Sequence, residues 1–195
     1  MNYLAHIYLS GNDKELTIGN FIADSVKGNI LKKKLPQRVK DGIILHRKID
    51  TFTDSHPIVY KSKHRLFDKY SHYSSVIVDI LYDHFLAKNW QNYHSTKLNI
   101  YVENFYLLLK YNFEILPKPV QNFYPYMVSH NWLLSYAEID GIERILKQMN
   151  NRINGKIRLD HSVIELKEYY TEFEEEFTEF FTELTEYVTQ EIKEG

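Results

Sequence analysis

Residues 160–192 read DHSVIELKEYYTEFEEEFTEFFTELTEYVTQEI, a stretch without glycine or proline. Apolar side chains recur in it every three or four positions, the spacing that places them on one face of an α-helix. This stripe consists of Phe173, Phe177, Phe180, Phe181 and Leu184. Asp160 is a good helix N-cap, so we predict one long C-terminal helix from Asp160 to about residue 192. The aromatic stripe predicts core packing rather than a binding site.

The rest of the chain also favours helices. Only seven glycines and five prolines occur in 195 residues, and alternating strand patterns are short. We predict an all-α fold, a single-domain multi-helix bundle over residues 1–195 that ends in the long helix. The other predicted helices cover 16–29, a segment that starts after Pro36 and includes Val39 to Asp50, 56–69, 74–92, 97–114, 118–128, 130–136 and 140–152.

Composition excludes several classes of protein. Hydrophobic residues make up 44% of the chain, which is typical of globular proteins. There is no cysteine, so disulfides, thiolate metal sites and a cysteine nucleophile are excluded. No signal peptide and no apolar run of about 20 residues is visible, and we therefore expect a cytoplasmic protein without a membrane segment.

The formal net charge of −2 conceals two segments of opposite sign. Residues 165–194 are rich in glutamate, which predicts a solvated helix face. Residues 27–48 form a basic segment, which is either a solvated face or a docking surface for an acidic partner. Its cations are Lys27, Lys32, Lys33, Lys34, Arg38, Lys40, Arg47 and Lys48.

Histidines and aspartates interrupt apolar stretches in the first half of the chain. His46 and Asp50 are four residues apart and share a helix face, which Asp54 could continue. Asp24 ends an apolar run with an asparagine one turn earlier. Burying an unpaired ionised group is costly, so each such residue needs a partner. The others of this kind are His6, Asp79, Asp83 and His84.

Each of these residues alone has a structural explanation, such as a capped helix or a satisfied backbone carbonyl. Together they come from four segments, and a helical bundle can gather such side chains around one point. Mixed histidine and carboxylate ligands suit Mn²⁺, Mg²⁺, Fe²⁺ or Zn²⁺. Such an ion activates water and neutralises phosphoryl oxygens in phosphodiester hydrolysis. No P-loop, dinucleotide-binding glycine pattern, nucleophile elbow or H-E-x-x-H motif competes with this interpretation.

An ordered set of short motifs resembles the acyl carrier protein phosphodiesterase family. Each motif alone is weak, but the set spans about 150 residues in the family's order. The motifs are Met1-Asn2-Tyr3-Leu4-Ala5-His6, Gly19-Asn20-Phe21-Ile22-Ala23-Asp24, Leu45-His46-Arg47-Lys48-Ile49-Asp50 with Thr53-Asp54, Asp79-Ile80-Leu81-Tyr82-Asp83-His84-Phe85, Trp132-Leu133 and Ile139-Asp140.

The resemblance implies an all-helical, metal-dependent enzyme from a non-canonical branch of the HD phosphatase/phosphodiesterase superfamily. It implies hydrolysis of the phosphodiester between 4′-phosphopantetheine and a serine of holo acyl carrier protein, with Mn²⁺ preferred. The carrier protein is small and acidic, so the basic segment would dock it. The predicted substrate-binding residues are Lys27, Lys32, Lys33, Lys34, Arg38, Arg47 and Lys48.

The adjacent His-Asp pair that gives the superfamily its name is absent, and the nearest pattern is the reversed Asp83-His84. Helix-face geometry therefore guides our choice of ligands. We predict Asp24, His46 and Asp83 as catalytic metal ligands. His6, Asp50, Asp79 and His84 are predicted as further ligands or as partners of ligands.

Two other functions remain open from the sequence. One is hydrolysis of a nucleotide or another small phosphodiester on the same scaffold, although an extended basic segment favours a protein substrate. The other is a non-enzymatic binding module for acidic partners, which would leave the His and Asp residues unexplained. A nucleic-acid partner is disfavoured by the slightly negative overall charge and by the few aromatics within the basic segment.

Overall fold

The computed structural model describes residues 1–29, 34–152 and 157–194. The described residues form helices joined by short turns and contain no strand, which confirms the all-α prediction. The α-helices are α1 (Tyr3–Leu9), α2 (Lys14–Ile22), α3 (Gln37–Ser55), α4 (Pro57–Tyr70), α5 (Ser74–Lys88), α6 (Leu98–Tyr111), α7 (Lys118–Ser129), α8 (Trp132–Ser135), α9 (Ile139–Arg152), α10 (Val163–Glu168) and α11 (Tyr170–Glu194). Single 3₁₀ turns lie between them at Ala23–Ser25, Ser71–Tyr73, Trp90–Asn92, Phe113–Ile115 and Leu159–Ser162.

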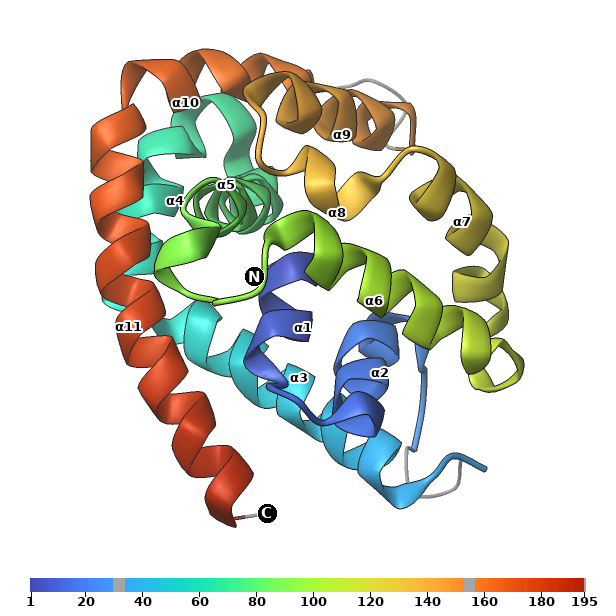
Figure 1. Ribbon diagram of the computed structural model, residues 1–195. Helices are drawn as coiled ribbons and strands as arrows, with labels where there is room; N and C mark the ends of the chain where they lie inside the picture. The colour runs from blue at the N-terminus through green and yellow to red at the C-terminus, as the bar shows by residue number, and fades with distance from the viewer. Residues whose placement is uncertain (30–33, 153–156, 195) are drawn as a thin grey trace.

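The long C-terminal helix, α11, runs along one side of the molecule (Figure 1). It packs against α3, α4 and α5, and the five residues of its predicted stripe are at most 1% exposed. Phe177 meets Tyr82 and Phe85 of α5 at ring-centroid distances of 5.6 and 6.0 Å. The predicted core role of the stripe is therefore confirmed.

A charged pair fixes the position of α11 on α4. Arg65 donates two hydrogen bonds to the Glu176 carboxylate, at 2.7 and 2.8 Å, and Glu176 is only 4% exposed. The hydroxyl of Ser62 donates to the same carboxylate. Most other glutamates of α11 face solvent, as the sequence predicts for a solvated face.

Two predicted helices differ most from those in the structure. The helix predicted over 16–29 ends as an α-helix at Ile22 and continues as one 3₁₀ turn to Ser25. The predicted C-terminal helix is interrupted at Tyr169, so that α10 and α11 are separate. Asp160 does not cap either helix, because its carboxylate instead accepts hydrogen bonds from Arg158 and Asn150.

The first helix, α1, was not predicted. Asn2 caps it by accepting a hydrogen bond from the Tyr3 amide. The buried carboxylate of Asp83 on α5 accepts from the amides of Leu4 and Ala5 at 2.7 and 3.2 Å. Amides in the first turn of a helix have no hydrogen-bond acceptor within the helix. Here a residue about 80 positions away supplies the acceptor for α1. No local pattern can show such a contact.

The buried apolar residues form one cluster that extends from Met1 to Val188, as a single domain would require. None of the described helices is both long enough and apolar enough to cross a lipid bilayer.

Candidate metal centre

Helices α2 and α3 approach each other more closely than side chains would normally permit, because two glycines face each other. A Cβ atom on Gly19 would lie 2.0 Å from the Val39 carbonyl oxygen, and one on Gly42 would lie 2.2 Å from the Leu16 carbonyl oxygen. Both approaches are shorter than any tolerated contact. The close packing brings the backbone of Asn20 on α2 against His46 on α3.

His46 lies at the centre of a polar cluster. Its Nε2 atom is 3.0 Å from Asp50 Oδ2, one turn further along α3. The same nitrogen is 3.2 Å from Oδ1 of Asp24, which follows α2. The predicted shared helix face of His46 and Asp50 is thus present, and Asp24 reaches it from the neighbouring segment.

His6 of α1 completes the cluster. Its ring stacks on that of His46, with centroids 3.9 Å apart and planes inclined by 17°. Its Nε2 atom lies 3.3 Å from Asp50 Oδ1 and is buried without a hydrogen-bond partner among the described residues. We call His6, Asp24, His46 and Asp50 the His/Asp cluster.

Asn20 fixes the orientation of both imidazole rings through their Nδ1 atoms. Its side-chain NH₂ group donates to the His6 carbonyl at 2.8 Å and to Ser10 Oγ at 3.0 Å. Its Oδ1 must therefore accept from Nδ1–H of His6, at 2.8 Å. The Asn20 backbone carbonyl accepts from Nδ1–H of His46, also at 2.8 Å. Both Nε2 atoms are left to face the carboxylates.

The charges of the cluster are strongly coupled. Burial opposes a charge on His46, but the carboxylates of Asp24 and Asp50 outweigh it and raise the pKa of His46 to about 9. Burial lowers the pKa of His6, and the positive charge of the neighbouring His46 ring also lowers it. His46 in turn lowers the pKa of Asp24. Burial alone would raise the pKa of Asp50, yet the two imidazoles hold it below its usual range. One proton on His46 therefore balances part of the charge of two carboxylates.

This arrangement fits a divalent cation. Donor atoms of His6, His46 and Asp50 all lie within 4.8 Å of one another. A histidine that binds a metal through Nε2 usually donates its Nδ1–H to a carbonyl or carboxylate, as both of these do. Two neutral imidazoles and two carboxylates carry a charge of −2, which a divalent ion would neutralise. Nε2 of His6 is buried without a hydrogen-bond partner in the described part of the chain, so it is the ligand atom that most needs a metal ion.

The cluster opens into a cavity of about 530 Å³, which we call the cluster cavity. Asp24, with 73% of its side chain exposed, lies at its surface, while Asp50 is 42% exposed and His46 only 8%. The cavity is also lined by Asp54, His72, Tyr73 and Asp79. A substrate of moderate size can therefore reach the carboxylates from solvent.

The other predicted ligands lie apart from the cluster. Asp79 accepts a hydrogen bond from the amino group of Met1 at 2.8 Å and lines the cluster cavity. Asp83 is fully buried and accepts three backbone N–H groups at the start of α1. Both ring nitrogens of His84 are occupied, because Nδ1 donates to the Tyr136 carbonyl and Nε2 accepts from the Tyr170 hydroxyl. The structure therefore does not bring Asp83 or His84 to the cluster, and both have structural partners.

Two cations of the basic segment form ion pairs with carboxylates of this chain. Arg38 pairs with Asp13 and Asp41, and Lys48 pairs with Glu191 of α11. Lys27, Lys34 and Arg47 are exposed. The predicted residues Lys32 and Lys33 lie outside the described part of the chain.

Sequence reasoning gave no role to Asn20, although it holds both histidines. The signal was present, since a lone asparagine within the apolar run Ile18-Gly19-Asn20-Phe21-Ile22 must find buried hydrogen-bond partners. His6 was predicted as a further ligand or as a partner of a ligand, because its place beside His46 depends on how α1 packs.

Fold and site together define an all-helical protein whose histidines and carboxylates form a candidate metal centre. Comparison with known families identifies it further: the chain belongs to the acyl carrier protein phosphodiesterase family, whose model matches residues 1–184. This confirms the resemblance seen in the sequence motifs.

Two relatives show how extensive the similarity is. A protein of Photorhabdus laumondii named acyl carrier protein phosphodiesterase is 30% identical over 171 residues, covering 87% of this chain and 86% of its own. A protein of the same name from Enterobacter sp. is 33% identical over 153 residues, covering 78% and 79% of the two chains. No solved structure matches.

Proposed function

We propose that this protein hydrolyses the phosphodiester that joins 4′-phosphopantetheine to a serine of holo acyl carrier protein, releasing the apo carrier. The observation that carries the proposal is the His/Asp cluster: two imidazole Nε2 atoms and two carboxylates face one another beside an open cavity. The family of the chain and the names of its relatives support this substrate over other phosphodiesters.

The proposed cofactor is Mn²⁺, with Mg²⁺, Fe²⁺ and Zn²⁺ as alternatives for the same donor set. His6, His46 and Asp50 would hold the ion, and Asp24 would join them from the cavity side. When bound, it would lower the pKa of a water molecule and neutralise charge on the phosphoryl oxygens. We leave Asp83 and His84 out of the proposed ligand set, because both are fully engaged within the fold.

The residues of the cluster have distinct proposed roles. Asn20 engages both Nδ1–H groups and directs both Nε2 atoms toward the carboxylates, so neither ring would have to turn to bind the ion, which would replace the proton on His46 Nε2. Asp50 lies within 3.3 Å of Nε2 of both stacked imidazoles, one carboxylate oxygen to each. Asp24 is the most exposed member, and it is positioned to orient a water molecule against the phosphorus atom.

The basic segment is proposed to dock the acidic carrier protein. Lys27, Lys34 and Arg47 are exposed cations in the described part of this segment, and long-range attraction between opposite charges accelerates association. Arg38 and Lys48 are proposed to contribute less, because carboxylates of this chain already pair with them. Raising the ionic strength should therefore raise KM for the carrier more than it lowers kcat.

The test is the intact mass of holo acyl carrier protein after incubation with this protein and Mn²⁺, with a chelator control. We expect a metal-dependent loss of the phosphopantetheine mass. His46→Ala and Asp24→Ala should abolish this loss while the circular dichroism spectrum remains helical. His64→Ala, which changes an exposed histidine on α4, is the matched control and should remain active.

Other outcomes would select another function. An unchanged carrier together with a bound metal ion would reject this substrate and favour a small phosphodiester. An unchanged carrier without metal binding would reject the enzyme and favour a binding module for acidic partners.

A further inference from the structure

A second cavity adjoins the cluster cavity, and Asp24 is the only member of the His/Asp cluster among its described lining residues. Its volume is about 290 Å³, and Asp24 and Asp79 belong to the walls of both cavities. Three further residues are shared, namely Met1, Val76 and Met149. A ligand whose reacting group lies at the cluster can therefore extend into this space without leaving the protein.

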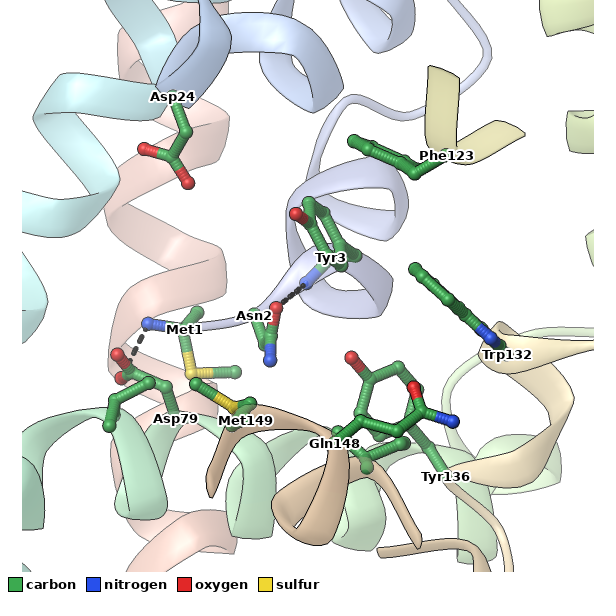
Figure 2. A pocket seen from close by; sticks show the side chains of 12 residues that line it. Met1, Asn2, Tyr3, Asp24, Asp79, Phe123, Trp132, Tyr136, Gln148 and Met149 are labelled. Carbon is green, nitrogen blue, oxygen red and sulfur yellow. Dashed lines mark hydrogen bonds and ion pairs between the residues drawn. The ribbon is translucent and has the colours of Figure 1, made fainter. Parts of the chain in front are cut away.

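The lining of the second cavity is acidic at one end and aromatic at the other. Asp24 and Asp79 lie at one end, and Phe123 and Trp132 lie at the opposite end (Figure 2). The rings of Phe123 and Trp132 are stacked, with centroids 5.9 Å apart and planes inclined by 18°. Tyr3 lies between the two ends. We call this space the aromatic cavity.

Polar groups are placed sparsely along the aromatic cavity. Tyr136 and Gln148 line the cavity on the same side in Figure 2. The side-chain oxygen of Asn2 is engaged with the Tyr3 amide, so its NH₂ group is the part left for a ligand. The indole N–H of Trp132, buried without a partner among the described residues, points away from Tyr3 in Figure 2, so Trp132 presents its apolar ring to the cavity.

We propose that the aromatic cavity binds the pantetheine arm of the prosthetic group while its phosphate lies at the His/Asp cluster. This inference rests on the proposed function and names the binding site for the part of the substrate beyond the phosphate. The arm is a narrow, uncharged chain with two amide groups between short hydrocarbon segments. Apolar walls with a few placed hydrogen-bonding groups are typical of sites for such ligands.

Alternative occupants fit less well. A phosphate in the aromatic cavity would meet the carboxylates at its entrance, and the cation there, the Met1 amino group, is already paired with Asp79. A helix of the carrier protein, about 10 Å across with side chains, is too wide for a cavity of this volume. The carrier therefore stays outside, and its prosthetic group alone enters.

Binding of the arm can be measured without catalysis. The chain has two tryptophans, and the other one, Trp90, is buried and donates to the Thr96 carbonyl at 2.7 Å. In a Trp90→Phe variant, the emission of Trp132 reports on the aromatic cavity alone. Titration with pantetheine, which has no phosphodiester, should change this emission saturably. A Phe123→Ala change in the same background should weaken the binding about tenfold, as expected for loss of one packed aromatic contact.

Kinetics with holo carrier protein supply the second measurement. Phe123→Ala and Gln148→Ala should each lower kcat/KM by about tenfold, while the affinity for Mn²⁺ stays that of the wild type. Tyr126→Ala is the matched control, since Tyr126 lies on α7 with Phe123 but does not line the aromatic cavity. This variant should keep the wild-type kcat/KM.

The outcomes separate this inference from the proposed function. If the carrier is cleaved, but pantetheine leaves the Trp132 emission unchanged and both variants keep wild-type kcat/KM, the aromatic cavity is not the arm site and the function stands. If the carrier is not cleaved, but pantetheine binds and Phe123→Ala weakens it, the cavity assignment stands and the function fails. Absence of both cleavage and binding overturns both.

Discussion

Asn20 uses its side chain for one histidine of the cluster and its backbone carbonyl for the other. Replacing it with alanine removes the acceptor for His6 Nδ1–H and the donors to the His6 carbonyl and Ser10. We expect Asn20→Ala to reduce Mn²⁺ affinity by about 10–100-fold, the usual effect of losing a residue that orients a metal ligand. Isothermal titration calorimetry would measure it. Asn89→Ala, which removes an amide bonded to Glu174, is the control and should bind normally.

Asp83 gives a pH dependence that is separate from the cluster. Burial raises the pKa of Asp83 to about 7, even though three backbone amides and the Met1 amino group favour its charged form. In the unfolded chain this carboxyl ionises near its ordinary value of about 4. Between these two pH values the folded protein holds a proton that the unfolded chain has lost. Its contribution to the free energy of unfolding therefore falls as pH rises from about 4 to about 7.

Comparison with Asp83→Asn isolates this contribution, because the variant cannot titrate there. The free energy of unfolding of the wild type, relative to that of the variant, should decrease from pH 4.5 to pH 7.5, values that each lie about half a unit above one of the two pKa values. Urea unfolding at the two pH values measures the difference. A wild-type advantage that increases with pH would show that the amide hydrogen bonds lower this pKa instead.

At the scale of elements, the contact between α2 and α3 sets the geometry of the site. A methyl group on Gly42 would lie 2.2 Å from the Leu16 carbonyl oxygen and 2.9 Å from the Asn20 amide nitrogen. Alanine favours helices over glycine by about 1 kcal/mol, but here the helices must separate to admit it. We expect Gly42→Ala to lower the free energy of unfolding by about 1–3 kcal/mol, as overpacking does.

The same change should also weaken metal binding, because separating α2 from α3 moves the Asn20 carbonyl away from His46. Chemical denaturation and Mn²⁺ titration of Gly42→Ala test the two effects together. Thr51→Ala changes an exposed residue of the same helix and should leave both nearly unchanged. Normal Mn²⁺ affinity in Gly42→Ala would mean that the cluster tolerates a wider helix spacing.

At the scale of the whole molecule, the sequence predicted those features that arise within a single helix. The periodic apolar residues gave the helices and the aromatic core, and four-residue spacing placed His46 and Asp50 on one face. Contacts between distant segments were not predictable. Asp83 and His84 match the pattern of a buried ligand, yet they bind α1, Tyr136 and Tyr170. Likewise, the pairing of Lys48 with Glu191 depends on where α11 lies.

Metal binding should stabilise the whole protein, because the His/Asp cluster draws on α1, the turn after α2, and α3. A ligand that binds only the folded chain, at 100 times its Kd, adds about 2.7 kcal/mol to the free energy of unfolding. For a chain of this size each kcal/mol raises Tm by about 2–4 °C. We therefore expect Mn²⁺ to raise Tm by about 5–10 °C in a thermal unfolding experiment, and a chelator to reverse the rise.

The cluster variant Asp50→Asn decides whether this stabilisation arises at the proposed site. Asp50 contacts both imidazoles, so its neutral analogue removes one charge of the site and leaves the surrounding packing in place. The variant should show little or no rise in Tm at the same Mn²⁺ concentration, because the affinity that drives the shift is lost. A rise equal to that of the wild type would mean that the stabilising ion binds elsewhere in the molecule. The metal centre on which hydrolysis is proposed to depend would then also lie elsewhere.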